Sequence, residues 1–417
     1  MKSDKKRGSP KGLPQPAEIE LTRKNLPLRI ILLVMAIILA IGAFGYGIAS
    51  LLNSQPGWNE IKCASGNVNC SQDFVLNYYL GNAGISASTE NKKLSTLYTK
   101  LAEDGYRLFY NEYTAEGYHN IAYVNQHVNE DITVEPALYK ALSQIVSARN
   151  RAIFMAPIYV EYQRIFTAQS DPEAGQYDPT RNPELMAYIT ELCGFSSNPD
   201  MIDIQILGDN RLRLNVSQAY LAYARENEIT EYLDFGWMTN AFIADYIADA
   251  LIENGHTNGY LTSYDGFTRN LYSGEEQLSL NLFQREGNDI LMPAVLQYQG
   301  RMSLVSLRDF PISDRDSWHY YAFADGRIAS SMLDPATGRE ASAVSSMICY
   351  SKNAGCGEIL LAMMPAYMSE TLDTAALNAL KDRQIFAMYP QGQKVYANDP
   401  NADIRILDAN VYTRESF

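Results

Sequence analysis

The segment SSMLDPATG, residues 330–338, combines residues that build a tight turn. An Asp in the first position caps its own backbone, the following Pro presets φ, and Gly accepts a positive φ. Turns of this kind present reactive side chains in active sites, and they also end ordinary hairpins. The segment therefore predicts a turn from Asp334 to Gly338, and whether it serves chemistry depends on the rest of the chain.

A row of three carboxylates, Asp245, Asp249 and Glu253, follows a helical spacing of four residues. Carboxylates on one helix face could bind a metal ion or perform acid and base chemistry. Like charges at this spacing more often mark a solvated face, where they repel one another slightly. We therefore expect these side chains to face solvent.

The five cysteines include two pairs with the same spacing, Cys63 with Cys70 and Cys349 with Cys356, and a single Cys193. In an oxidising compartment each pair could close a short disulfide loop. A zinc site is less favoured because no C-x-x-C spacing occurs and the histidines are scattered. The four histidines are His119, His127, His256 and His319.

The sequence contains none of the common catalytic or phosphate-binding frames. A phosphate loop, a dinucleotide fingerprint, a G-x-S-x-G elbow and an H-E-x-x-H helix are all absent from it. What occurs instead is an ordered series of blocks. They read LDFGWMTNAFIADYIADALIENG (233–255), YLTSYDG (260–266), ADGRIASSMLDPATG (324–338) and SSMICYSKNAGCGEILLAMM (345–364).

This series resembles the ApbE family, the FAD:protein FMN transferases. Two upstream segments, NEYTAEGYHNIAYVNQH (111–127) and AIFMAPIYVEY (152–162), are similar to the family's earlier blocks. The resemblance implies an α+β, T-fold-like architecture of antiparallel sheets with packed helices. It also implies FAD as the ligand, contacted by Tyr113, Asp234 and, at the position of a family lysine, Asn240.

The resemblance further implies attack by a threonine hydroxyl of a target protein on the FAD pyrophosphate, assisted by a divalent metal. Three positions depart from that pattern: the family's histidine falls on Ser331, and its metal-binding Asp and Thr fall on Gly357 and Leu361. Serine is no base near neutral pH, and Gly and Leu side chains supply no oxygen ligand. Magnesium is therefore doubtful, and we assign no catalytic or metal-binding residue. Glu358, adjacent to Gly357, could serve as a ligand only if the helix register shifts by one.

The local patterns predict the elements that must position these residues. An apolar stripe predicts a helix over 135–149, a second one predicts a helix over 239–255, and alternation around Gly-Asp-Asn predicts a hairpin over 202–214. Further strands are expected over 260–262, 278–283, 290–298 and 302–307, and helices over 358–366 and 374–383.

The N-terminal region predicts membrane attachment. Residues 1–28 form a basic tail, and within residues 29–52 the run 30–52 has no charged side chain, enough to span a bilayer. The segment up to Arg29 carries eight basic and three acidic side chains, a net of +5 against −14 for the whole chain, and basic flanks stay cytoplasmic. A cleaved signal peptide is the alternative, but the apolar run is long for one.

The rest of the chain would then lie outside the cytoplasm, with 53–91 as a juxtamembrane stalk or cap and 92–417 as the ApbE-like domain. Residues 30–417 together carry a net charge of −19, the difference between −14 and +5. Phosphate backbones would repel this charge, so nucleic acid is not an expected partner.

Three functions remain open. The first is a membrane-anchored, extracytoplasmic ApbE-like pseudoenzyme that binds a flavin, a nucleotide or a flavoprotein partner. The second is an active magnesium-dependent FAD:protein FMN transferase that modifies a Thr of a membrane redox protein, with Glu358 as metal ligand and Asp334 nearby. The third is an acidic surface interaction protein whose 29 tyrosines present a binding face on this scaffold.

Overall fold

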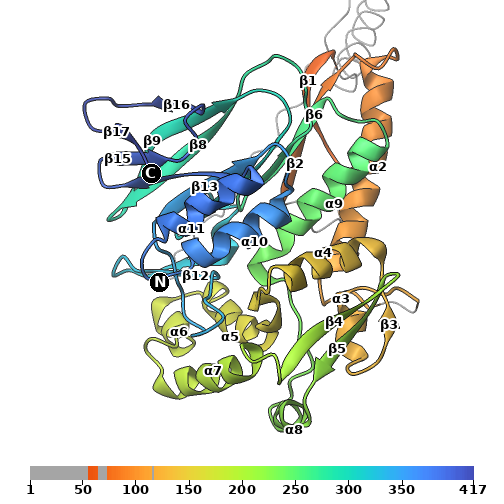
Figure 1. Ribbon diagram of the computed structural model, residues 1–417, viewed down its shortest axis with the longest axis vertical. Coiled ribbons are helices and arrows are strands. Elements are labelled where there is room, and N and C mark those ends of the chain that lie inside the picture. The colour runs from red at the N-terminus through yellow and green to blue at the C-terminus, as the bar shows by residue number, and fades with distance from the viewer. Residues whose placement is uncertain (1–54, 64–72, 115–116) are drawn as a thin grey trace, which may run out of the picture. The chain divides into compact units, whose positions relative to one another are not determined.

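The computed structural model describes residues 55–63, 73–114 and 117–417. Helices and mostly antiparallel sheets are interspersed along the chain (Figure 1), which confirms the predicted α+β class. The predicted tail (1–28) and anchor (29–52) lie outside the described residues. Within those that are described, no helix is both long and apolar enough to cross a membrane.

The largest sheet has nine strands in the described part of the chain. Neighbouring strands pair antiparallel except the last two, which are parallel. In spatial order the strands are β1 (Gly57–Ile61), β2 (Phe74–Leu80), β6 (Gly259–Ser263), β7 (Phe267–Asn270), β10 (Met302–Arg308), β13 (Ser346–Ser351), β14 (Phe386–Gln391), β15 (Lys394–Ala397) and β17 (Thr413–Ser416).

The segment predicted as a stalk, 53–91, belongs to this sheet where it is described. Strand β1 pairs with β2, and β2 pairs with β6, whose residues lie far away in the sequence. Phe74, Leu76 and Tyr78 alternate with less buried residues along β2 and enter the core. The Asn- and Ser-rich composition concealed this alternation, so the predicted boundary near Lys92 is wrong, and the compact unit begins at Gln55.

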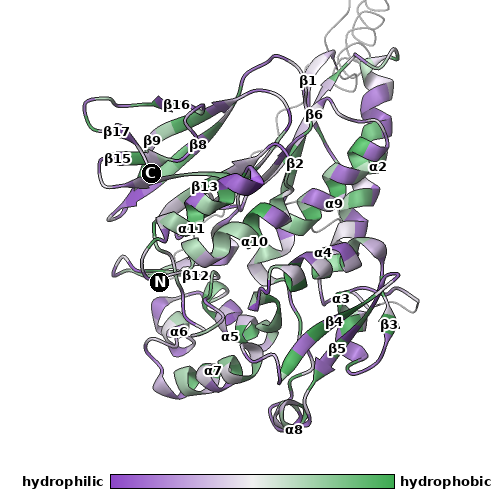
Figure 2. Cartoon of the chain, viewed as in Figure 1, coloured by the Kyte–Doolittle hydropathy of each residue, from purple (hydrophilic) through white to green (hydrophobic). Residues whose placement is uncertain are grey.

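Three helices pack against the sheet and are joined by a fourth, α4 (Pro136–Ser147), which contacts α2 and α10. The three are α2 (Ala87–Phe109), α9 (Thr239–Glu253) and α10 (Cys356–Tyr367). Helix α10 is hydrophobic over most of its length (Figure 2) and is buried accordingly. Helices α2 and α9 approach closely at Gly105, where an added Cβ would lie 3.0 Å from Cγ2 of Ile243. The helices predicted over 135–149, 239–255 and 358–366 are thereby confirmed.

The remaining helices are shorter. Their bounds are α3 (Ile121–Gln126), α5 (Ala156–Phe166), α6 (Asp171–Gln176), α7 (Pro183–Ser196), α8 (Gln218–Glu226) and α11 (Thr374–Ala379), with 3₁₀ turns η2 (Ala152–Phe154), η3 (Gly236–Met238), η4 (Ser317–His319) and η5 (Leu380–Arg383). Helix α11 and η5 together account for the helix predicted over 374–383.

Three small sheets complete the described part. The predicted hairpin is confirmed as β4 (Ile202–Gly208) and β5 (Arg211–Val216), whose turn residues Asp209 and Asn210 both have positive φ. A second core lies between the large sheet and the sheet β16-β9-β8, where Leu282 and Leu296 meet Leu304. The strands not yet given are β3 (Ile132–Thr133), β8 (Leu278–Glu286), β9 (Asp289–Tyr298), β11 (Tyr320–Ala322), β12 (Ile328–Ser330) and β16 (Asp403–Ile406).

The expected disulfide between Cys349 and Cys356 is not formed, and both residues are buried free cysteines. The thiol of Cys356 donates instead to the carbonyls of Thr268 and Leu304, at 3.4 and 3.8 Å. Burial raises the pKa of both thiols, so the reactive thiolate is disfavoured. Cys70, the partner expected for Cys63, lies outside the described residues.

Candidate functional site

The predicted turn at Asp334 is confirmed, and both oxygens of the Asp334 carboxylate accept hydrogen bonds within it. Oδ1 of Asp334 accepts from the backbone N–H of Ala336 at 3.0 Å, and Oδ2 accepts from the hydroxyl of Thr337 at 2.8 Å. Gly338 has a φ of +66° and packs so closely that an added Cβ would lie 2.5 Å from Cγ2 of Ile189. The turn therefore fixes the end of the segment that carries Ser331.

The hairpin β11–β12 places a histidine beside Ser331. Tyr320 pairs with Ser330, and one position further out Ser331 donates its backbone N–H to the carbonyl of His319 at 2.9 Å. Nδ1 of His319 lies 3.0 Å from the Ser331 hydroxyl oxygen. An imidazole therefore lies next to position 331, but it belongs to His319, the last residue of η4, directly before β11. Counting outward from the turn at Ala324-Asp325-Gly326 would have found this pairing, because antiparallel strands keep a fixed register.

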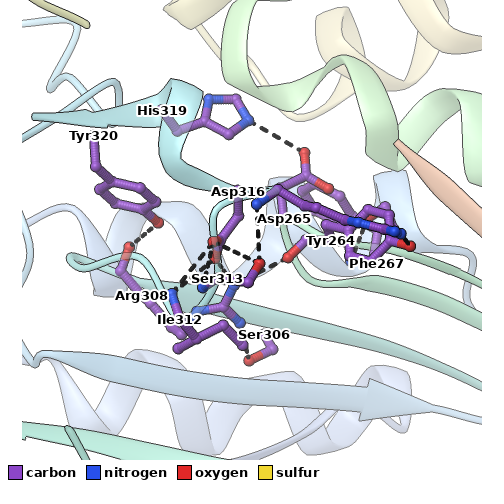
Figure 3. A network of polar contacts seen from close by, with 12 residues as sticks. Tyr264, Asp265, Phe267, Ser306, Arg308, Ile312, Ser313, Asp316, His319 and Tyr320 are labelled. Carbon is purple, nitrogen blue, oxygen red and sulfur yellow. Dashed lines mark hydrogen bonds and ion pairs between the residues drawn. The ribbon is translucent and has the colours of Figure 1, made fainter. Parts of the chain in front are cut away.

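A carboxylate and an amide complete this group of side chains. Nε2 of His319 lies 3.4 Å from Oδ2 of Asp265, and the amide of Asn240 donates to the same oxygen at 2.9 Å (Figure 3 shows His319 and Asp265). Asp265 belongs to the tight turn between β6 and β7, and Asn240 to the first turn of α9. We call Asn240, Asp265, His319 and Ser331 the polar cluster.

Asn240 and His319 are buried, whereas Asp265 and Ser331 are partly exposed as whole residues. The side chains of His319 and Asp265 are 5% and 7% exposed. A small cavity of about 20 Å³ lies among Trp237, Asp265, His319, Ser331 and their neighbours. That volume suits about one water molecule.

Four buried polar atoms of the polar cluster and its surroundings have no hydrogen-bond partner within the protein. They are Oδ1 of Asn240, Oδ1 of Asp265, Nε1 of Trp237 and Nε of Arg308. Asp265 and Arg308 both line the small cavity. Because an unpaired buried polar atom costs about 1–3 kcal/mol, such a concentration of them indicates a binding site for a small polar group.

A second acid, Asp73, lies near Asp265. Burial, with a further contribution from the charge of Asp265, raises the pKa of Asp73 to about 7. Asp73 is therefore only partly ionised near neutral pH and adds less than a full negative charge beside the polar cluster.

The buried ion pair of Arg308 with Asp316 holds the loop that leads to His319. Arg308 donates to Oδ2 of Asp316 at 3.0 Å and to the carbonyl of Tyr264 at 3.2 Å. The Asp316 carboxylate also accepts from the backbone N–H groups of Ile312 and Ser313, at 3.1 and 2.9 Å (Figure 3). These bonds fix the loop on the turn that carries Asp265.

A polar groove of about 680 Å³ adjoins the small cavity at Arg308, which lines both. Arg315 lies over the ring of Tyr264 at 4.7 Å and hydrogen-bonds its hydroxyl. The groove's size is within the range of small-molecule sites. Its other lining residues include Thr262, Ser263, Ser279, Asn281, Ser306 and Ser313.

Of the three residues expected to contact a flavin, the structure brings only Asn240 into the polar cluster. Asp234 lies just before η3, where it accepts from the backbone N–H of Gly236 at 2.7 Å. Burial raises the pKa of Asp234 to about 7, with Glu231 and Glu112 contributing. The ring of Tyr113 contacts Tyr118 and Arg107, in a different loop.

The start of α10, where the family pattern places metal ligands, is occupied by a structural contact. The Asp245 carboxylate accepts from the backbone N–H groups of Cys356 and Gly357, at 2.8 and 2.9 Å, and forms an ion pair with Arg269. The expectation that Asp245 faces solvent is therefore wrong, because the helix α9 turns this carboxylate onto the positive end of α10. Asp249, also paired with Arg269, is partly exposed, and Glu253 is exposed.

The residues present at that position do not fit a divalent metal. Leu361 is buried and apolar, and Glu358 forms an ion pair with Arg383 at 2.8 Å. An added Cβ on Gly357 would lie 2.8 Å from the ring of Phe242, so a longer side chain has no room there. Across the described residues, no three His, Cys, Asp or Glu side chains are grouped in a way that could hold a metal ion.

The fold is similar to that of solved flavin transferases. The flavin transferase ApbE from Vibrio cholerae gives a TM-score of 0.51 at 14% identity, over 80% of this chain and 93% of the other. The ApbE protein from Thermotoga maritima gives 0.53 at 12%, over 86% and 100%. A histidine-to-glycine mutant of the Vibrio protein gives 0.50 at 15%, over 80% and 93%.

At these identities the likeness shows the fold alone, and it confirms the predicted ApbE-like architecture. No family model and no curated protein matches the sequence.

Proposed function

We propose that this chain is a membrane-anchored, extracytoplasmic protein with the ApbE fold that has lost metal-dependent FMN transfer and acts by binding a flavin, a nucleotide or a flavoprotein partner. The observation that carries this proposal is the occupied start of α10. Asp245 and Arg269 hold it, while Gly357 and Leu361 supply no oxygen ligand from a side chain.

The sequence pattern alone supports the anchoring part of the proposal. The uncharged run within 29–52 and the basic residues before it favour a single span with a cytoplasmic N-terminus. Expression followed by carbonate washing and external proteolysis of intact cells tests this part. The proposal requires the chain to stay in the membrane pellet and the large unit to be cleaved from outside.

A flavin nucleotide fits the polar groove in size, and the groove supplies Arg315 for a phosphate. Bound there, FAD would contribute the isoalloxazine ring and the pyrophosphate group, whereas this chain's residues would only hold them. Tyr113 and Asp234 stay proposals as flavin contacts. The Asn240 amide is already bonded to Asp265, so we assign it the role of holding that carboxylate.

One observation favours a second candidate, an active FAD:protein FMN transferase. His319 lies beside Ser331, the position where the family pattern expects a histidine, so an imidazole is available as a base. The ligands considered for this candidate are otherwise engaged, since Glu358 pairs with Arg383 and Asp334 closes its own turn.

One experiment separates the two candidates. The full chain in detergent is incubated with FAD, magnesium and an acceptor domain that contains a Thr target, beside the Vibrio cholerae flavin transferase as a positive control. We expect no covalent flavin fluorescence on the acceptor and a saturable change in free FAD fluorescence. Magnesium-dependent labelling that is lost in H319A would establish the active transferase instead.

A further inference from the structure

Ser331, His319 and Asp265 form a relay whose geometry matches an activated hydroxyl. A carboxylate oxygen only accepts hydrogen bonds, so Nε2 of His319 carries the proton that points to Asp265, at 3.4 Å. Nδ1 is then the lone-pair nitrogen, and the Ser331 hydroxyl donates to it at 3.0 Å. This is the arrangement in which imidazole removes a proton from a serine hydroxyl.

The surrounding structure holds the relay in place. Asn240 donates to the same Asp265 oxygen as His319, which fixes the carboxylate from the side of α9. Gly266 has a φ of +111°, and an added Cβ there would lie 2.1 Å from the carbonyl oxygen of Ser306, so the turn carrying Asp265 is pressed onto β10. His319 is covered on one side by the exposed residue Trp318, whose ring centre lies 3.4 Å from that of the imidazole. The base is therefore shielded while Ser331 reaches the surface.

A donor for a developing negative charge lies on the same cavity. Arg308 is 4% exposed, lines the cavity with Ser331, and its Nε–H has no acceptor within the protein. A buried, unpaired N–H beside a nucleophile is what stabilises the oxyanion of a tetrahedral intermediate.

We propose that Ser331 is a nucleophile that takes an acyl group from a small carboxylic ester, with His319 as the base and Asp265 and Asn240 as positioning residues. The small cavity has room for about one water-sized group, which suits the carbonyl oxygen of the ester rather than its acyl chain. Acyl transfer by a serine needs no metal ion.

The proposed ester hydrolysis at Ser331 consumes only the ester and one water molecule. The Ser331 oxygen bonds to the carbonyl carbon while its proton passes to Nδ1 of His319. The ester C–O bond then breaks, and the leaving alkoxide takes that proton, which leaves an acyl-serine. Water attacks the acyl-serine with His319 again as the base, which releases the carboxylic acid and restores the hydroxyl.

The test uses a fluorophosphonate probe on the full chain in detergent. We expect a single adduct by intact mass, mapped to Ser331 by peptide mass spectrometry, and a burst of nitrophenol from p-nitrophenyl acetate. S331A should abolish both signals, and H319Q should slow labelling by at least about a hundredfold. S330A, which alters the neighbouring buried serine, should label like the wild type, and thermal melts identify variants that fail to fold.

An adduct on a residue other than Ser331, or no adduct on folded wild-type protein, would overturn the proposal. So would labelling of Ser331 at an unchanged rate in folded H319Q. Because neither signal involves FAD, these outcomes are independent of the flavin-binding result.

Discussion

His319 shows how one residue changes the interpretation of the site. The sequence gives it no special context, since the histidines are scattered and Ser331 occupies the position where the family pattern expects a base. The hairpin brings the imidazole to that serine from a position 12 residues away, and the β6–β7 turn adds Asp265. An imidazole therefore lies beside Ser331, although the sequence places no histidine near that position.

At the residue scale, Asp234 should give the protein a specific dependence of stability on pH. Burial raises the pKa of Asp234 from 3.8 to about 7, so the folded state keeps this proton after the unfolded chain has lost it. The contribution of this group to the free energy of unfolding is full below about pH 4, declines by up to about 1.4 kcal/mol per pH unit, and is lost by about pH 7.

D234N should therefore gain stability relative to the wild type as the pH rises from 4 to 7. Urea denaturation across that range measures the difference. D200N, a change at an exposed carboxyl, controls for the altered net charge. Parallel stability curves for the wild type and D234N would contradict the expectation.

The secondary-structure elements position these residues through a few close contacts. The β6–β7 turn reaches β10 at Gly266, and α9 reaches the start of α10 at Asp245. His319, directly before the hairpin β11–β12, reaches the β6–β7 turn at Asp265. Each contact joins segments far apart in the chain. Substitutions at these contacts should therefore cost more than similar substitutions elsewhere on the same elements.

G266A tests the close approach of the turn. The positive φ and the backbone oxygen 2.1 Å from an added Cβ leave no side chain that could move away, so we expect a loss of about 2 kcal/mol or more in the free energy of unfolding. G287A is the matched control, since Gly287 has a φ of +60° and open space around it. It should cost only about 1 kcal/mol. Equal losses in the two variants would count against the argument.

D245N tests the contact between α9 and α10. Removing this charge leaves Arg269 with only the more exposed Asp249, and breaking a buried pair typically costs about 3–5 kcal/mol. E358Q, on α10 itself, breaks an exposed pair and should cost less than about 1 kcal/mol. Chemical denaturation measures both. A large loss in E358Q, restored by added magnesium, would instead favour a metal ligand there.

The whole described unit depends on its N-terminal strands. Strands β1 and β2 extend the large sheet beyond β6, and their buried residues belong to the same core as α2 and α9. The sequence predicted a stalk for this segment because its turn-forming residues conceal two short strands. The strands become recognisable only when β6, far along the chain, pairs with them.

Removal of residues 1–80 should therefore prevent cooperative folding, since it exposes the edge of β6 and part of the core. Removal of residues 1–54 should leave the unfolding transition intact. Circular dichroism melts of the two truncated chains make the comparison. If both unfold at the same temperature, the strands are as dispensable as a stalk would be.

The sequence by itself determined the features that depend on neighbouring residues. The stripe of α9, the hairpin β4–β5 and the turn at Asp334 each follow from side chains a few positions apart, because capping, turn geometry and periodicity act over that range. The order of the blocks also predicted the ApbE-like fold.

Only the tertiary structure decided which distant residues meet. It placed His319 and Asp265 beside Ser331, turned Asp245 onto α10, kept Cys349 and Cys356 apart, and added β1 and β2 to the sheet. These outcomes depend on the order of strands in the sheet and on the packing of helices against it, which join segments that carry no local signal for one another.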